Sequence, residues 1–189
     1  GDMFDAVMNY QITGPILNFF GADDLNLTWS HQDIVLKAGG DAADFQTQIT
    51  AMFDLYDWEI HYAQWNMLDS HDMPRSLSCV SGDKASLKLA WLFMFTISGA
   101  PCLFYGDEIG LDGGHDPECR KAFPWETSKW DKDLLEYAKA CISLRKEHAS
   151  LRRGEYKRIY AEDQVMAYMR SYKNENITVA FNVSNDERT

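Results

Sequence analysis

The sequence contains few basic residues, and this shortage limits the partners that the protein can bind. Lysine and arginine number 18 against 29 aspartate and glutamate residues, which gives the 189 residues a formal net charge of -11 at pH 7. Nucleic-acid binding usually needs a basic surface that neutralises phosphates. The composition therefore argues against nucleic acid as a partner and is compatible with a neutral ligand such as carbohydrate.

Long hydrophobic runs and paired cysteines are also lacking. No apolar stretch is long enough to span a bilayer, so no membrane partner is predicted. The four cysteines are scattered, with no CxxC pair and no histidine at metal-ligand spacing, which supports neither a zinc site nor a thioredoxin-like motif. Because free thiols are typical of a reducing compartment, we expect a cytoplasmic protein. Without such motifs, we expect no metal or other cofactor.

What the sequence does contain is globular material in which apolar strands and helices alternate. Hydrophobic residues make up 46% of the chain and aromatic residues 13%, which is too apolar for a disordered tail. The predicted strands are residues 4–10, 64–69 and 102–105, and the predicted helices are residues 15–21, 41–55, 83–97 and 130–148. We expect the strand at 102–105 to be buried, the stretch 13–15 to form a turn and residues 22–40 to form a loop.

After residue 153 the pattern changes to strands alone. Residues 155–160, 165–172 and 177–183 carry β-branched and aromatic residues, and the segments between them are rich in turn-forming residues. The end of the chain therefore predicts a small all-β unit.

The stretch 66–75, NMLDSHDMPR, ends an apolar run in the pair His71 and Asp72. Such a pair offers a hydrogen-bond donor and a carboxylate to a ligand above the end of a strand. The alternative is a turn in which Asp72 caps the following helix, because aspartate before proline is common there. The dipeptide alone does not decide between the two.

A second candidate segment follows the predicted strand at 102–105. The loop is rich in glycine and aspartate and contains Asp116 and Arg120, which could equally form an ordinary surface ion pair. Asp107 and Glu108 are adjacent, and adjacent side chains on extended backbone point in opposite directions, which argues against a catalytic dyad. Trp125 is the one candidate for stacking on a sugar ring, although most aromatic residues are simply core.

Together these stretches resemble the α-amylase superfamily of glycoside hydrolases, and within it the neopullulanase, cyclomaltodextrinase and maltogenic amylase group. Residues 66–75 resemble the fourth sequence signature, at the end of the seventh barrel strand, and residues 99–125 resemble the eighth strand with its loop. The resemblance implies an α/β fold. Residues 1–150 would form the C-terminal half of a (β/α)8 TIM barrel, strands 6 to 8, and residues 151–189 the start of an all-β C-terminal domain.

The resemblance also implies roles for single residues. Asp72 matches the carboxylate that stabilises the transition state, and His71 matches a histidine that binds the same sugar. Asp116 and Arg120 fit a loop of the form DPxCRK that holds a neighbouring glucose unit. These four residues are the predicted substrate-binding site, and the carboxylates of residues 107 and 108 are expected to be structural.

Two motifs of the superfamily do not occur in the sequence. The nucleophilic aspartate lies in a motif of the type GxRxDxxxH, and the acid glutamate in a segment like GEIW; the 189 residues contain neither. We therefore expect a piece of a retaining enzyme that cleaves α-glucosidic bonds in maltodextrins, cyclodextrins or pullulan, with the piece alone inactive. Whether the intact enzyme binds calcium is left open.

Two alternatives remain at this point. A half-barrel could bind glucan without chemistry or self-associate as a homodimer through its exposed barrel edges, because unpaired strands attract a partner. The parent enzyme could also be a transglycosylase of the same superfamily.

Overall fold

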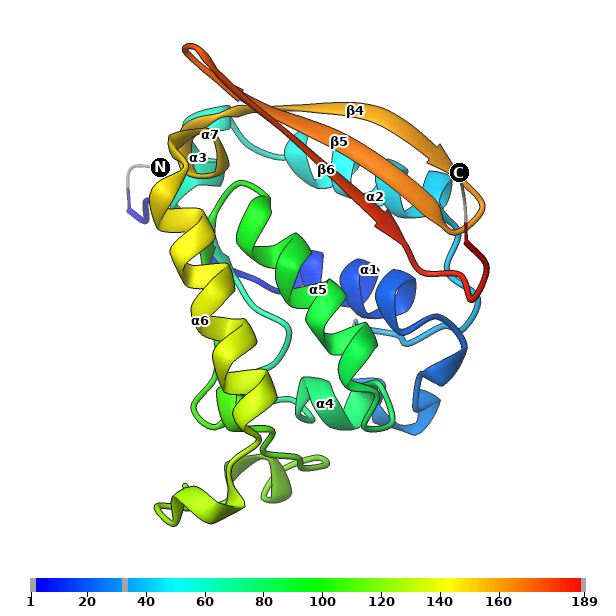
Figure 1. Cartoon of the computed structure of the whole chain (residues 1–189), viewed down its shortest axis with the longest axis vertical. Coiled ribbons are helices and arrows are strands. Elements are labelled where there is room, and N and C mark those ends of the chain that lie inside the picture. The colour runs from blue at the N-terminus through cyan, green and yellow to red at the C-terminus, as the bar shows by residue number, and fades with distance from the viewer. Residues whose placement is uncertain (1–2, 32–33, 188–189) are drawn as a thin grey trace.

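The computed structural model describes residues 3–31 and 34–187 (Figure 1). The helices are α1 (Tyr10–Gly21), α2 (Ala42–Phe53), α3 (Trp58–Ala63), α4 (Ser76–Cys79), α5 (Lys84–Thr96), α6 (Lys132–Glu147) and α7 (Ala149–Arg153). The strands are β1 (Met8–Asn9), β2 (Trp65–Asn66), β3 (Ala100–Pro101), β4 (Glu155–Glu162), β5 (Val165–Tyr172) and β6 (Glu175–Asn182). Short 3-10 turns cover Ala22–Asp24, Leu27–Trp29, Asp107–Ile109, Glu118–Arg120 and Thr127–Lys129.

The first sheet is parallel, with strand order β1-β2-β3. Met8 pairs with Trp65, and both side chains are exposed, whereas Asn9 and Asn66 on the other face are buried. The two buried amides satisfy each other, because Asn9 Nδ2 donates to Asn66 Oδ1 at 2.9 Å. One face of the sheet therefore packs against the helices, and the other is open.

Helix α1 begins five residues before the position that the sequence predicts. Pro15 lies inside the helix and the predicted turn at 13–15 is wrong. A proline inside a helix costs about 3 kcal/mol. Ile12, Ile16 and Phe19 recur at helical spacing and are almost fully buried, so the burial of this face outweighs the cost.

The third parallel strand also lies elsewhere than predicted. It occupies Ala100–Pro101 and not residues 102–105. The ladder extends by one hydrogen bond, from Cys102 N to Asn66 O at 2.8 Å, and the Cys102 side chain is exposed, contrary to the predicted buried strand. Phe104 N then donates to Asp107 Oδ2 at 3.0 Å, which turns the chain out of the sheet.

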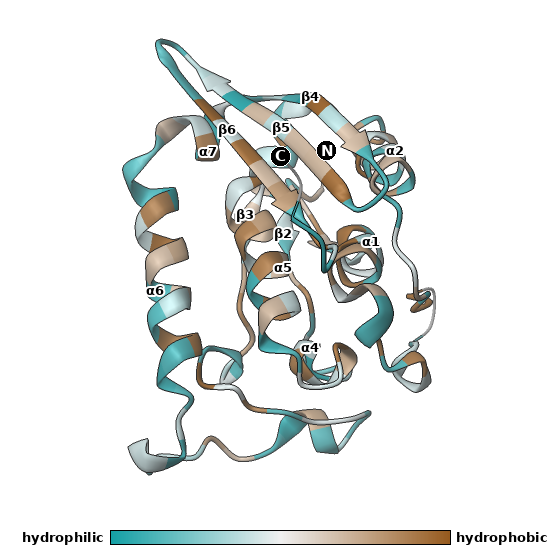
Figure 2. Ribbon diagram, turned by 45° about the vertical axis from the view of Figure 1, so that its right-hand side comes forward, coloured by the Kyte–Doolittle hydropathy of each residue, from teal (hydrophilic) through white to brown (hydrophobic). Residues whose placement is uncertain are grey.

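Strands β4, β5 and β6 form an antiparallel sheet that lies across α1, α2 and α5, while the loop between β3 and α6 projects from the opposite end of the molecule (Figure 1). The sheet and the helices share one hydrophobic cluster that includes Phe20, Phe93 and Phe181. Hydrophobic colours on α1, α5, β5 and β6 mark the elements that meet there (Figure 2). Arg170 is fully buried below the sheet and donates to Thr96 O at 2.6 Å.

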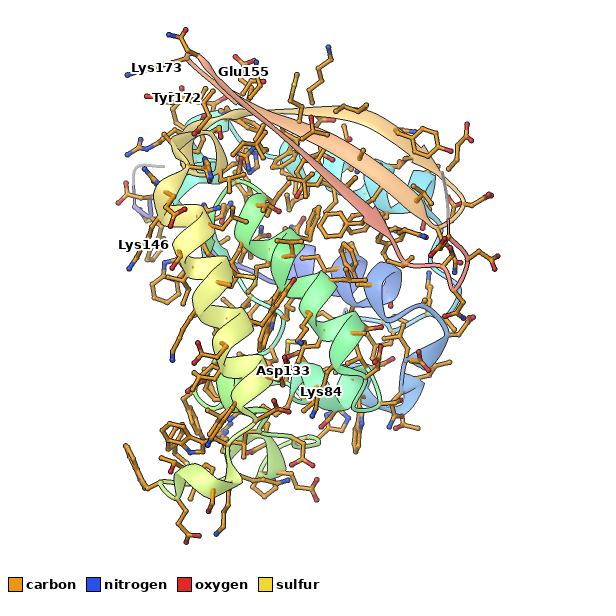
Figure 3. All side chains as sticks on the ribbon, viewed as in Figure 1. Lys84, Asp133, Lys146, Glu155, Tyr172 and Lys173 are labelled. Carbon is orange, nitrogen blue, oxygen red and sulfur yellow. The ribbon has the colours of Figure 1, made fainter. Side chains whose placement is uncertain are left out.

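Ion pairs join α5 to the start of α6 on the surface, where Figure 3 labels Lys84 and Asp133. Lys84 Nζ lies 2.5 Å from Asp131 Oδ2, and Lys88 Nζ lies 2.6 Å from Asp133 Oδ2. Asp131 also caps α6 by accepting from Leu134 N at 3.0 Å. These contacts fix the base of the loop that precedes α6.

Candidate functional site

His71 and Asp72 lie on the turn that follows β2, at the carboxyl end of the parallel strands. His71 Nε2 is 3.3 Å from Asp72 Oδ2, and the two side chains are 56% and 52% exposed. Asp72 N donates to Ser70 Oγ at 3.1 Å, and the same hydroxyl lies 2.9 Å from Tyr10 Oη. The turn is thus attached to the start of α1, while the side chains of His71 and Asp72 are about half exposed to solvent.

Arg120 brings the second predicted pair to the first. Its Nε donates to His71 O at 2.8 Å and lies 3.1 Å from Asp116 Oδ1, and its Nη2 lies 3.6 Å from Asp72 Oδ1. The guanidinium therefore stands between two carboxylates from two different loops. We call His71, Asp72, Asp116 and Arg120 the site quartet.

The ion pairs of the quartet add little to the stability of the fold. Its side chains are between 47% and 56% exposed, and exposed ion pairs contribute about 0–1 kcal/mol. The quartet offers two accessible carboxylates that accept hydrogen bonds, and a guanidinium and an imidazole that donate them. These groups match the hydroxyl groups of a sugar ring, which both donate and accept hydrogen bonds. The arrangement can bind a polyol, and the sequence-predicted residues lie together as one group.

Sequence reasoning missed a buried cluster beneath the quartet. Arg75 is fully buried; its Nη1 donates to Asp107 Oδ1 at 2.9 Å and its Nε to Cys119 O at 2.8 Å. Asp69 is also buried and accepts from Ser76 N at 2.6 Å. Burial raises the pKa of Asp69 and of Asp107. No local sequence signal reveals the cluster, because Arg75 and Asp107 lie 32 residues apart.

Asp107 and Glu108 have separate partners, in agreement with the prediction that they form no dyad. Asp107 points inward to Arg75, whereas Glu108 Oε2 accepts from Gly106 N at 2.8 Å. Trp125 is 83% exposed, with its ring centroid 4.9 Å from that of Phe123. Its role in stacking on a sugar stays a prediction.

Within residues 3–31 and 34–187, no group of three or more histidine, cysteine or acidic side chains is placed to hold a metal ion. The expectation that no cofactor is needed stays a prediction. Among the same residues, no helix is both long enough and apolar enough to cross a membrane.

Comparison with known proteins places these features in a family context. Residues 1–133 match the family model described as "Alpha amylase, catalytic domain". A cyclomaltodextrinase from Geobacillus thermopakistaniensis is 38% identical over 188 residues, which is 98% of this chain and 29% of that protein. Neopullulanase 2 from Thermoactinomyces vulgaris is 34% identical over 191 residues, which is 100% of this chain and 30% of that protein.

Solved structures give the same result. The debranching enzyme from Nostoc punctiforme superposes with a TM-score of 0.88 at 36% identity, over 95% of this chain and 37% of that one. The chain spans 29% to 30% of the length of the two curated relatives.

Proposed function

The chain belongs to the α-amylase catalytic-domain family, and we propose that it supplies the part of an α-glucan-cleaving barrel that holds the sugar beside the scissile bond. Its fold is the predicted one, the C-terminal half of a (β/α)8 barrel followed by the start of a β domain. The division that we propose is residues 1–150 for the barrel and 151–189 for the β domain.

The observation that carries the proposal is the position of Arg120 between Asp72 and Asp116, over the ends of parallel strands. In the proposed mechanism, Asp72 and His71 bind hydroxyls of the sugar that is cleaved. Hydrogen bonds to a carboxylate strengthen as positive charge develops on the ring, so Asp72 stabilises the oxocarbenium-like transition state. Asp116 and Arg120 hold the neighbouring glucose unit.

The proposed substrates are maltodextrins, cyclodextrins or pullulan, which the printed names of the relatives support. The reaction of the whole enzyme would retain the anomeric configuration, with a nucleophile and an acid that these 189 residues do not contain. The chain alone is therefore proposed to bind glucan without cleaving it. We also propose a cytoplasmic location, supported by four free cysteines and testable by cell fractionation.

Titration of the chain with maltotriose, followed by NMR or calorimetry, tests the binding role. Arg120→Ala removes charge-assisted hydrogen bonds, so we expect the affinity to fall about tenfold or more. Arg158→Ala removes an exposed arginine from β4 and is expected to leave the affinity unchanged. EDTA should have no effect. Equal affinities for both variants, or hydrolysis of maltotriose by the pure chain, would contradict the proposal.

A second candidate, self-association, is supported by apolar side chains on the open face of the parallel sheet and the segment before it. These exposed side chains are Met3, Phe4, Val7, Met8 and Trp65. Parallel sheets are normally covered on both faces, so a second copy of the chain could cover this one. Light scattering coupled to size-exclusion chromatography is expected to show a dimer that Trp65→Glu dissociates; a monomer at high concentration would reject this candidate.

The third candidate function is transglycosylation by the whole enzyme. It shares the binding step proposed for the quartet and differs only in the molecule that accepts the sugar. Product analysis of the whole enzyme with a labelled glucose acceptor distinguishes the two, because hydrolysis leaves the label in glucose alone.

A further inference from the structure

A buried charge cluster lies directly beneath the site quartet. Arg75 is 0% exposed, Asp69 3% and Asp107 4%. Buried ionisable groups are costly unless they are paired and hydrogen-bonded. The contacts of these three residues therefore indicate what the cluster does.

Arg75 joins the two loops that carry the quartet. It follows the His71–Asp72 turn, and its guanidinium donates to Tyr105 O at 2.7 Å and to Cys119 O at 2.8 Å in the other loop. Its backbone N–H adds a bond to Gly113 O at 2.9 Å. Because residue 119 precedes Arg120, a shift of Arg75 would move Arg120 relative to the turn.

One nitrogen of the Arg75 guanidinium faces aromatic rings and not a hydrogen-bond acceptor. Among the described residues, Nη2 has no hydrogen-bond partner. The guanidinium carbon lies 4.0 Å from the ring centroid of Phe104 and 4.7 Å from that of Tyr105. The negative faces of the two rings partly compensate a buried cation.

The two buried carboxyl groups each accept hydrogen bonds within the cluster. Asp107 accepts on both oxygens, from Arg75 on Oδ1 and from Phe104 N on Oδ2. Asp69 accepts from Ser76 N on Oδ2, and burial raises the pKa of both carboxyls, that of Asp107 well above its usual range, which favours a single proton held between them. With that single proton, two carboxyls and one guanidinium have no net charge.

We propose that Asp69, Asp107 and Arg75 form a net-neutral positioning unit, with one proton shared by the two carboxyls, that sets the position of Arg120 relative to Asp72 and hence the affinity of the quartet for sugar. The inference rests on the sugar-binding role proposed above. The three residues act through others and touch no substrate themselves.

Two isosteric variants test the positioning unit. In Asp69→Asn, the amide oxygen still accepts from Ser76, and Asp107 keeps both of its donors, so one carboxylate still neutralises Arg75. In Asp107→Asn, the NH2 group faces either Arg75 or Phe104 N, and both are donors. We expect Asp69→Asn to keep its maltotriose affinity within about twofold and Asp107→Asn to lose about tenfold or more. Equal effects of the two variants would overturn the proposal.

The pH profile provides a readout that a general loss of packing would not change. Burial raises the pKa of the pair, so the native state keeps a proton that the unfolded chain releases, and stability falls as pH rises through that raised pKa. The other titratable groups near the pair are the Cys79 and Cys102 thiols; burial raises the pKa of both, that of Cys79 to about 12, so they stay neutral. The stability of Asp69→Asn should not fall in this pH range.

The resonance of the Arg120 Nε–H, which is bonded to His71 O, reports the position of Arg120 without any sugar. It should be unchanged in Asp69→Asn and shifted or broadened in Asp107→Asn. If no form of the chain binds maltotriose but this contrast and the carboxyl titration appear, the sugar-binding role fails while the positioning unit stands. If Asp107→Asn does not fold, the wild-type titration and Asp69→Asn decide: a wild-type carboxyl pair without a raised titration overturns the proposal.

Discussion

Truncation of Phe181 tests whether the β4–β6 sheet and the barrel helices share one core. Phe181 is 2% exposed, and its ring centroid lies 5.0 Å from that of Phe20 on α1 and 6.2 Å from that of Phe93 on α5. Changing a buried phenylalanine to alanine in a packed core costs about 3–5 kcal/mol. Since domains are stable by about 5–15 kcal/mol, Phe181→Ala should remove a large fraction of the total.

Urea unfolding followed by tryptophan fluorescence and circular dichroism measures this loss. With a slope of about 2 kcal/mol per molar urea, the midpoint should fall by about 2 M. Ile159→Ala on β4 is the control, because that side chain is 52% exposed and its loss should cost below about 1 kcal/mol. A loss below about 1 kcal/mol for Phe181→Ala, or unfolding of the sheet in a separate transition, would refute a shared core.

Two further changes test local features. Gly99→Ala places a Cβ 2.5 Å from Asn66 Nδ2 at a φ of +114°, whereas in Gly82→Ala, at a φ of +83°, the Cβ meets nothing within 4 Å. The positive φ destabilises both variants by about 1–2 kcal/mol. Because of the overlap with Asn66, thermal unfolding should show that Gly99→Ala loses about 1–3 kcal/mol more stability than Gly82→Ala. Hydrogen bonds from Ser150 and a neighbouring histidine lower the pKa of Glu175 from 4.5 to about 2, so its contribution to stability is present above pH 4.5 and is lost as the pH falls towards 2. Glu175→Gln should therefore be less stable than wild type at pH 7 and equal to it near pH 2; a difference that does not depend on pH contradicts the assignment.

The sequence predicts elements well where a cap and a helical period coincide. Asp83 is the predicted start of the helix at 83–97, and its carboxylate accepts from Ala85 N and Ser86 N at the start of α5. The three C-terminal strands are found within a few residues of their predicted bounds, because turn-forming residues separate them. The parallel strands are shorter than predicted. Met67 and Leu68 after β2 are buried without a ladder, whereas Phe4 and Val7 before β1 are exposed.

The unpredicted parts depend on contacts between distant residues. Pro15 predicts a helix start, because proline is favoured in the first turn of a helix. The helix begins earlier, at Tyr10, because the residues before Pro15 are buried. Arg75 and Asp107 are 32 residues apart in the sequence, and nothing in either local pattern points to the other. The quartet could be predicted from the family resemblance, whereas the cluster that supports it could not.

The most direct test of the central claim, that the quartet binds α-glucan, is a set of intermolecular NOEs between maltotriose and the chain. We expect contacts from glucose ring protons to the imidazole protons of His71 and to the Arg120 side chain. Contacts confined to other surfaces, such as the β4–β6 sheet, would contradict it.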